Sequence, residues 1–95
     1  MFVILLNYIK PLSEIDQFVD SHREFLERHY ASGHFLLSGR KEPRTGGVIL
    51  ALANTKAEIE KIIKLDPFYK QAIAEYEIVE FLPSMAAPAL ANFKA

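Results

Sequence analysis

The sequence contains no cysteine among its 95 residues, so it can form neither a disulfide framework nor a thiol nucleophile. It also lacks a long apolar run. The opening segment MFVILLNY is too short to cross a membrane, and it has neither the basic region nor the small-residue cleavage site of a secretory signal. These absences predict a cytoplasmic protein without a membrane partner.

An excess of charge of one sign is absent as well. The formal net charge is −1, and acidic and basic residues are scattered along the chain. Such a chain presents no broad cationic surface to a nucleic acid or to an anionic membrane. We expect no nucleic-acid partner, and instead expect a small-molecule ligand and a second copy of the chain.

Motifs that hold cofactors and metals are missing too. The chain has no glycine-rich phosphate loop, no dinucleotide-binding fingerprint and no histidine pair in the metalloprotease pattern. Its three histidines are separated and come with no matched ligand set. The sequence therefore predicts neither a metal nor a cofactor.

What the sequence does contain is a regular succession of strand-like and helix-like segments. Apolar β-rich runs occupy residues 2–8, 34–40, 46–53 and 75–82, and helical spacing occupies residues 13–32 and 55–65. Ser13 and Thr55 are the expected N-caps, and Gly33 and Pro67 end the two helices. The order β-α-β-β-α-β predicts a ferredoxin-like α+β fold, with a four-stranded antiparallel sheet and two helices on one face.

The predicted strands also bear on assembly. Residues 2–6 and 48–53 are almost unbroken apolar runs, which indicates burial on both faces of the sheet, yet the two helices can cover only one. A second copy of the chain is the simplest cover for the other face, so we predict a homodimer through the open sheet face. We expect the domain to span residues 1–82, and residues 83–95, rich in alanine and proline, to form a C-terminal arm or tail.

A histidine occupies an apolar position of the first predicted helix. On a helical wheel, His22 lies near the middle of the stripe that contains Phe18 and Phe25. His29 falls close to the same angle, but it lies in the last turn, where an imidazolium suits the helix C-terminus. A histidine in such a stripe is either a hydrogen-bonded core residue or a functional group, and periodicity leaves both interpretations open.

A carboxylate occurs where the second predicted helix breaks, in the segment KLDPFYKQ. Asp66 followed by Pro67 is a common cap of a short helical turn, so a purely structural role is one interpretation. The other follows from the fold, because helices on the same sheet face border common clefts. A carboxylate near an imidazole fixes its tautomer and raises its basicity, which makes His22 and Asp66 candidates for a general acid/base pair.

Ser38 and Gly39 lie at the end of the second predicted strand, before the polar loop RKEPRTGG. Gly39 would let a ligand approach the backbone closely. Arg40, Lys41 and Arg44 form a small cationic patch that could attract an anionic substrate. An ordinary hairpin loop accounts for the same residues equally well.

In their order and separation, these segments resemble the YciI-like (YCII-related) family. The resemblance rests on SHREFL in the first helix, GHFLLSG at the helix-to-strand passage and LDPFYKQAI before the last strand, and it extends to about residue 82. It implies a ferredoxin-like dimer of the dimeric α+β barrel type, with a site containing His22 and Asp66. Ser38 and Gly39 match the strand end that borders the family's cleft, whereas Arg40 stands where many relatives have proline.

The resulting hypothesis is a small cofactor-independent enzyme of lyase or isomerase type. His22, assisted by Asp66, would move a proton on a small organic substrate bound beside Ser38, Gly39 and Arg40. One alternative is a non-catalytic dimeric domain that binds a small ligand or serves as an accessory module, and another is a purely structural histidine. The resemblance supplies no reaction, because this architecture hosts unrelated activities.

Overall fold

A computed structural model describes all residues from 1 to 95. The elements are β1 (Phe2–Tyr8), α1 (Leu12–Ile15), the 3₁₀ turn η1 (Asp16–Phe18), α2 (Val19–Ala31), β2 (Phe35–Arg40), β3 (Gly46–Ala51), α3 (Lys56–Ile63), α4 (Pro67–Lys70), β4 (Ala74–Glu80) and the 3₁₀ helix η2 (Pro88–Phe93). No helix is long and apolar enough to cross a membrane.

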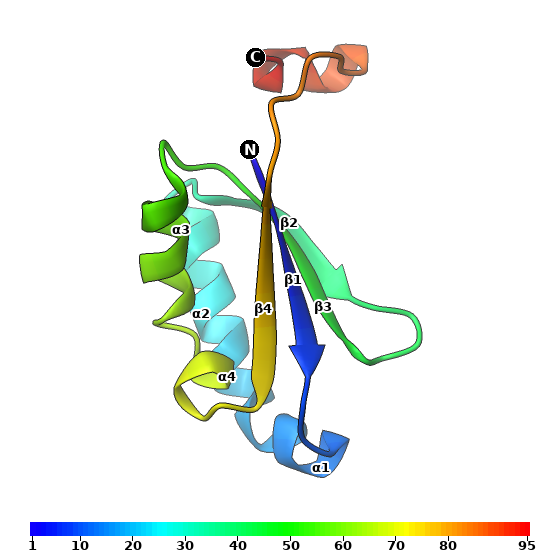
Figure 1. The fold of residues 1–95 in the computed structure, drawn as a ribbon, viewed down its shortest axis with the longest axis vertical. Coiled ribbons are helices and arrows are strands. Elements are labelled where there is room, and N and C mark those ends of the chain that lie inside the picture. Colours follow the sequence, from blue (N-terminus) through cyan, green and yellow to red (C-terminus); the bar gives the residue numbers. More distant parts are fainter.

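The four strands form one antiparallel sheet in the order β2-β3-β1-β4. Figure 1 shows α2, α3 and α4 together on one side of this sheet, with no helix on the other. This arrangement is the ferredoxin-like α+β fold, and the predicted fold class is confirmed. Observed strand ends and the bounds of α3 lie within two residues of the predicted ones, and Thr55 caps α3 by accepting a hydrogen bond from the Glu58 amide at 3.3 Å.

The first predicted helix is wrong in one respect, because it is broken rather than continuous. Ser13 does not cap it: α1 begins directly after Pro11 without a side-chain cap, and Phe18 leaves the helical conformation with φ −117° and ψ 7° before α2 starts. A straight helix over the predicted span would be about 30 Å long, whereas a seven-residue strand such as β1 covers about 23 Å. The break lets α1 turn across the end of the sheet, as Figure 1 shows, while Gly33, with φ 82°, ends α2 as expected.

The core lies between the sheet and the helices. Phe2, Ile4 and Leu6 of β1 point into it, where they meet Phe25 of α2 and the isoleucines of α3. The burial pattern along β1 alternates, so its intervening residues lie on the opposite face and are only half-buried. The predicted burial on both faces is therefore not complete within one chain. The strand register places six apolar side chains on this second face, which we call the open face: Val3, Leu5, Leu37, Val48, Leu50 and Val79.

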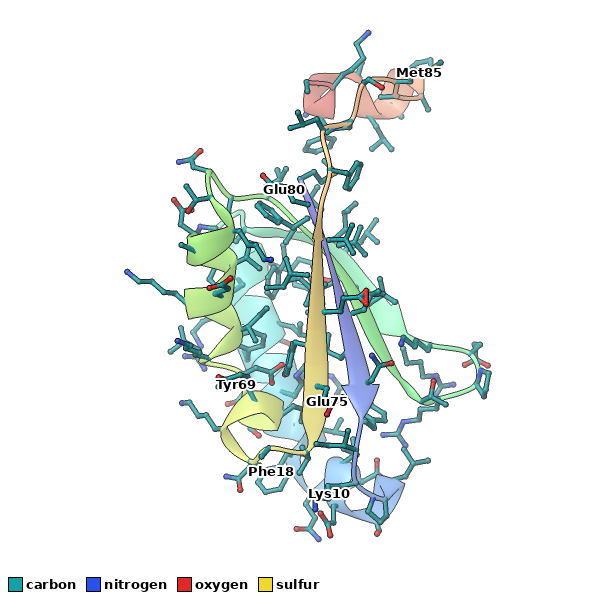
Figure 2. The ribbon with its side chains drawn as sticks, in the orientation of Figure 1. Lys10, Phe18, Tyr69, Glu75, Glu80 and Met85 are labelled. Atoms are coloured by element: carbon teal, nitrogen blue, oxygen red, sulfur yellow. The ribbon has the colours of Figure 1, made fainter.

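The chain beyond β4 leaves the body of the domain. Figure 1 shows this segment and η2 standing away from the sheet and the helices. The two ends of this C-terminal segment are joined by a hydrogen bond from the Ala95 amide to the Pro83 carbonyl at 2.8 Å. Met85, labelled in Figure 2, is 87% exposed. The arm therefore contributes nothing to the core described above.

One glycine is required by close packing of the central strands. A Cβ atom at Gly46 would lie 1.7 Å from the carbonyl oxygen of Leu6, which is a backbone atom of the neighbouring strand β1. A Cβ atom at Gly39, on the edge strand β2, would have no other residue within 4 Å apart from its two neighbours in the chain. The two glycines therefore differ in the cost of an added methyl group.

We expect Gly46→Ala to destabilise the protein by at least about 2 kcal/mol, because β1 would have to move to admit the new methyl group. Gly39→Ala should change the free energy of unfolding by less than about 1 kcal/mol. Urea denaturation of both variants measures the difference. Equal stabilities would mean that the β1–β3 spacing at Gly46 differs from the one described.

Candidate active site

Asp66 lies at the junction of α3 and α4 and is fully buried. The following Pro67 restricts Asp66 to an extended conformation, with φ −69° and ψ 127°, and takes the first position of α4. Its Oδ1 accepts a hydrogen bond from the Phe68 amide at 3.0 Å, so Asp66 is the N-cap of this short helix. The structural role expected for the Asp-Pro pair is therefore present, and it fixes the position of the carboxylate.

The structure brings His22 to this carboxylate from α2, the helix that packs beside α4. His22 Nδ1 lies 2.8 Å from Asp66 Oδ1, although the two residues are far apart in the sequence. The imidazole also stacks on the ring of Phe68, with centroids 4.0 Å apart and planes 6° from parallel. The three-residue segment Asp66–Phe68 thus supplies both the acceptor and the flat surface that orient the histidine.

This hydrogen bond determines how the imidazole presents its two nitrogens. A carboxylate oxygen only accepts, so Nδ1 carries the hydrogen and donates it to Asp66. In a neutral ring the lone pair then belongs to Nε2, which has no hydrogen-bond partner within the chain. His22 is thereby prepared to accept a proton at Nε2.

Tyr76 of β4 holds the second oxygen of the same carboxylate. The strand register places Tyr76 opposite Leu6 on the core side of the sheet, and its hydroxyl donates to Asp66 Oδ2 at 2.5 Å. Burial raises the pKa of the Tyr76 phenol well above its ordinary value, and the negative charge of Asp66 raises it further. The phenol therefore stays protonated and remains a donor, and no buried side-chain polar atom of the chain lacks a partner.

A cavity of about 440 Å³ opens beside His22, whose side chain is 16% exposed. Predicted site residues Ser38, Gly39 and Arg40 all line it, because the register of β2 turns Ser38 and Arg40 toward the helix side of the sheet. Asp66 does not line it and reaches it only through His22. The full lining is Leu6, Tyr8, Val19, His22, Arg23, Leu26, Ser38, Gly39, Arg40, Arg44, Gly47, Val48, Ile49 and Phe68.

The predicted cationic patch is divided by the structure. Arg40 and Arg44 line the cavity, but Lys41 does not, since its ammonium donates to the Asn7 side chain at 2.6 Å. Ser38 is held by a hydrogen bond between its hydroxyl and that of Tyr30. The patch therefore contributes two arginines to the cavity rather than three cations.

His29 does not share the cavity. Its Nδ1 donates to the Phe25 carbonyl at 2.9 Å, and its ring packs against Phe25 and Phe35. The structural interpretation of this histidine is thus the one its surroundings support. No three His, Cys, Asp or Glu side chains converge in a way that could hold a metal ion.

Tyr76→Phe removes the donor to Asp66 Oδ2 and leaves a buried carboxylate oxygen without a partner. We expect it to lower the free energy of unfolding by about 1–3 kcal/mol at neutral pH. Tyr69→Phe is the matched control, because Tyr69 lies on α4 (Figure 2), is 44% exposed and donates no hydrogen bond within the chain. Urea denaturation at pH 7 should find the control close to wild type.

The contribution of the Tyr76–Asp66 hydrogen bond to stability also depends on pH in the alkaline range. Because the folded pKa of Tyr76 is raised, its stabilising effect is fully present below the ordinary tyrosine pKa of about 10 and declines as the pH rises above it. The stability difference between wild type and Tyr76→Phe should therefore shrink above pH 10, by up to about 1.4 kcal/mol per pH unit. A difference that stays constant through this range would contradict the raised pKa.

The family model described as "YCII-related domain" matches residues 1–82 of the chain. Among solved structures, the 5-chloro-2-hydroxyhydroquinone dehydrochlorinase TftG from Burkholderia phenoliruptrix, in complex with 2,5-dihydroxybenzoquinone, superposes with a TM-score of 0.72 at 17% sequence identity, covering 87% of this chain and 95% of that one. A comparison with curated proteins gives no match.

The structural likeness, at this low identity, concerns the fold. The sequence match carries more, since it spans every strand and helix up to β4 and confirms the resemblance drawn from the motifs around His22 and Asp66. With 82 of its 95 residues matched by the family model, this chain belongs to the YCII-related domain family.

Proposed function

We propose that this protein is a small enzyme that transfers a proton on a small organic substrate, in a reaction of lyase or isomerase type. One observation carries the proposal. His22 is oriented by a buried carboxylate through Nδ1, and the same ring lines a cavity large enough for a small molecule. His22 is the proposed general acid/base and Asp66 the residue that positions it.

The proposed reaction begins when Nε2 of His22 takes a proton from a substrate atom. The electron pair of the broken bond then either forms a new double bond as a leaving group departs, or shifts within the substrate. In the first case the reaction is an elimination, and the proton is released to solvent. In the second, His22 returns the proton to another atom, and the reaction is an isomerisation.

Asp66 supports this proton transfer through its position. When His22 becomes an imidazolium, the carboxylate 2.8 Å away compensates the new positive charge. The hydrogen bonds from Phe68 and Tyr76 prevent the carboxylate from rotating toward another partner. Ser38, Gly39 and Arg40, on the opposite wall of the cavity, are the proposed substrate contacts.

The chemistry named for TftG is compatible with this proposal. A dehydrochlorination removes a proton and a chloride from one molecule, which a single positioned base can assist. The ligand in that structure, 2,5-dihydroxybenzoquinone, is a small planar ring of a size suited to the cavity described above. Chlorinated hydroxyhydroquinones are therefore the first compounds to test as substrates.

A non-catalytic ligand-binding domain is the competing function. It would use the same cavity, but it gives no reason for a histidine whose Nε2 is free while Nδ1 is held by a buried carboxylate. A purely structural histidine explains the hydrogen bond to Asp66, but it does not explain the opening of the ring to a cavity. The proton-transfer proposal accounts for both features together.

We expect His22→Gln to reduce turnover of 5-chloro-2-hydroxyhydroquinone by about 10²–10⁴-fold, the usual contribution of a general acid/base. Release of chloride and disappearance of the compound would be followed for wild type and variant. His29→Gln is the matched control, because His29 lies on the same helix, is equally a partly buried histidine, and does not line the cavity. The control should retain most of the activity.

A second assay covers substrates without chloride. Wild type should catalyse exchange of ring or side-chain protons of hydroxylated cyclic compounds with deuterated water, and His22→Gln and Asp66→Asn should both lose this exchange. Binding of such compounds by wild type without turnover or exchange would favour the ligand-binding function. Loss of thermal stability in His22→Gln with no effect on binding or turnover would favour the structural one.

We also propose that the protein is a homodimer joined through the open face. That face exposes a contiguous set of apolar side chains on all four strands, including Leu37 at 61% and Val79 at 43% exposure. Soluble monomers seldom leave such a patch uncovered, and a twofold pairing of two identical faces covers both at once. The site is on the other side of the sheet and remains accessible in this arrangement.

Wild type should sediment as a dimer at micromolar concentration, and Leu37→Glu should shift it toward monomer. The substitution places a charge within the apolar open face, and the monomer should tolerate it because Leu37 is exposed there. Leu65→Glu is the control, since Leu65 is 49% exposed and lies between α3 and α4 on the helix side. A wild-type monomer in analytical ultracentrifugation would contradict the proposed dimer.

A further inference from the structure

The cavity beside His22 is lined by three arginines and by no acidic side chain. Arg23 follows His22 on α2, Arg40 ends β2, and Arg44 lies in the β2–β3 hairpin. Three separate elements thus each contribute one arginine to the lining of the same cavity. In a chain with a net charge of −1, this concentration of positive charge is local to the cavity.

Two of these arginines have an acidic neighbour outside the cavity. Arg44 donates to Asp16 at 2.5 Å, and this hydrogen bond raises the pKa of the guanidinium and keeps it charged. Arg40 lies 3.3 Å from Glu42, and both side chains are largely exposed. Neither carboxylate lines the cavity, so both pairs are open to a ligand that approaches from the cavity side.

Arg23 has no ion pair within the chain. The carboxylate that orients His22 does not pair with it, because both oxygens of Asp66 accept hydrogen bonds from His22, Phe68 and Tyr76. Arg23 is therefore a free guanidinium beside the proposed base. Its planar set of donors is suited to two oxygens of an anion.

The remaining walls of the cavity are apolar or aromatic. They are formed by Leu6, Tyr8, Val19, Leu26, Ile49 and Phe68. The Tyr8 ring meets the Phe68 ring edge to face, with centroids 5.9 Å apart. Such walls favour the body of a small ring, whereas the arginines favour a negative charge on that ring.

We infer that the cavity binds its substrate as a small cyclic oxyanion (a phenolate, an enolate or a ring carboxylate), and that Arg23 is the residue that selects for this charge. The inference rests on the proposed function and specifies its substrate class. Arg23 holds the oxyanion next to His22, so that a proton on the same ring lies within reach of Nε2. The guanidinium also stabilises the negative charge that proton removal adds to the ring.

Paired ligands of equal shape and different charge test this inference. The acidic probe is 2,5-dihydroxybenzoquinone, whose hydroxyl groups are vinylogous carboxylic acids and are ionised at neutral pH. The neutral probe is 2,5-diaminobenzoquinone, which has the same ring without an ionisable oxygen. Dissociation constants measured by calorimetry at low and high salt should show at least tenfold tighter binding of the acidic probe to wild type, and this preference should weaken with salt.

Arg23→Gln should weaken binding of the acidic probe about tenfold and leave the neutral probe unchanged, while Arg23→Lys should restore part of the loss. Arg28→Gln is the matched control, because Arg28 is an exposed arginine of the same helix that does not line the cavity. Arg23 is itself exposed, so the fold should tolerate its substitution, as thermal melting curves of the variants would verify.

The outcomes separate this inference from the proposed function. If the acidic probe binds wild type no better than the neutral one, or if Arg23→Gln binds both as wild type does, the charge selection is wrong. Proton transfer by His22 on an uncharged substrate would survive that result. Conversely, Arg23-dependent preference for the anion, without turnover or deuterium exchange, would support the inference and contradict the proposed enzyme.

Discussion

The structure around the cavity depends on one buried carboxylate with three hydrogen-bond donors. Burying a charge is costly unless it is fully compensated, and Asp66 is compensated by its own helix turn, by α2 and by β4. Each of these elements is therefore tied to the same point. The position of His22 follows from this arrangement, because its ring lies between the carboxylate it bonds and the Phe68 ring on which it stacks.

The two faces of the sheet have different roles: one carries the core and the candidate site, and the other is an uncovered apolar surface. On the helix side, alternate residues of β1 form the core, and the same side of β2 and β4 carries Ser38 and Tyr76 into the neighbourhood of the site. The other face retains an apolar surface that helices do not cover. A small domain can hold a polar site inside its single core only if the buried polar groups satisfy one another, as they do here.

Much of the fold could be predicted from the sequence because its signals are local. Strand-like runs, the Thr55 cap and Gly33 each depend on neighbouring residues. The break at Phe18 could not be found this way, since it reflects the length of the sheet beneath the helix. The helical wheel and the Asp-Pro pair identified His22 and Asp66, but the donor Tyr76 depends on strand register. The only sign of Tyr76 in the sequence is the alternation of side chains along β4, which assigns Tyr76 to the core face.

The groups around the cavity differ in how strongly the core fixes them: some are buried, and others belong to an exposed hairpin. Asp66, which orients the imidazole, is fully buried and does not line the cavity, whereas Arg40 and Arg44 come from the β2–β3 hairpin, whose loop Figure 1 shows on the side away from the helices. Changes of sequence or length in that hairpin can alter which compounds enter without disturbing the histidine beneath. Divergence of substrate range within one scaffold is therefore open to evolution by small steps, each tolerated by the folded chain.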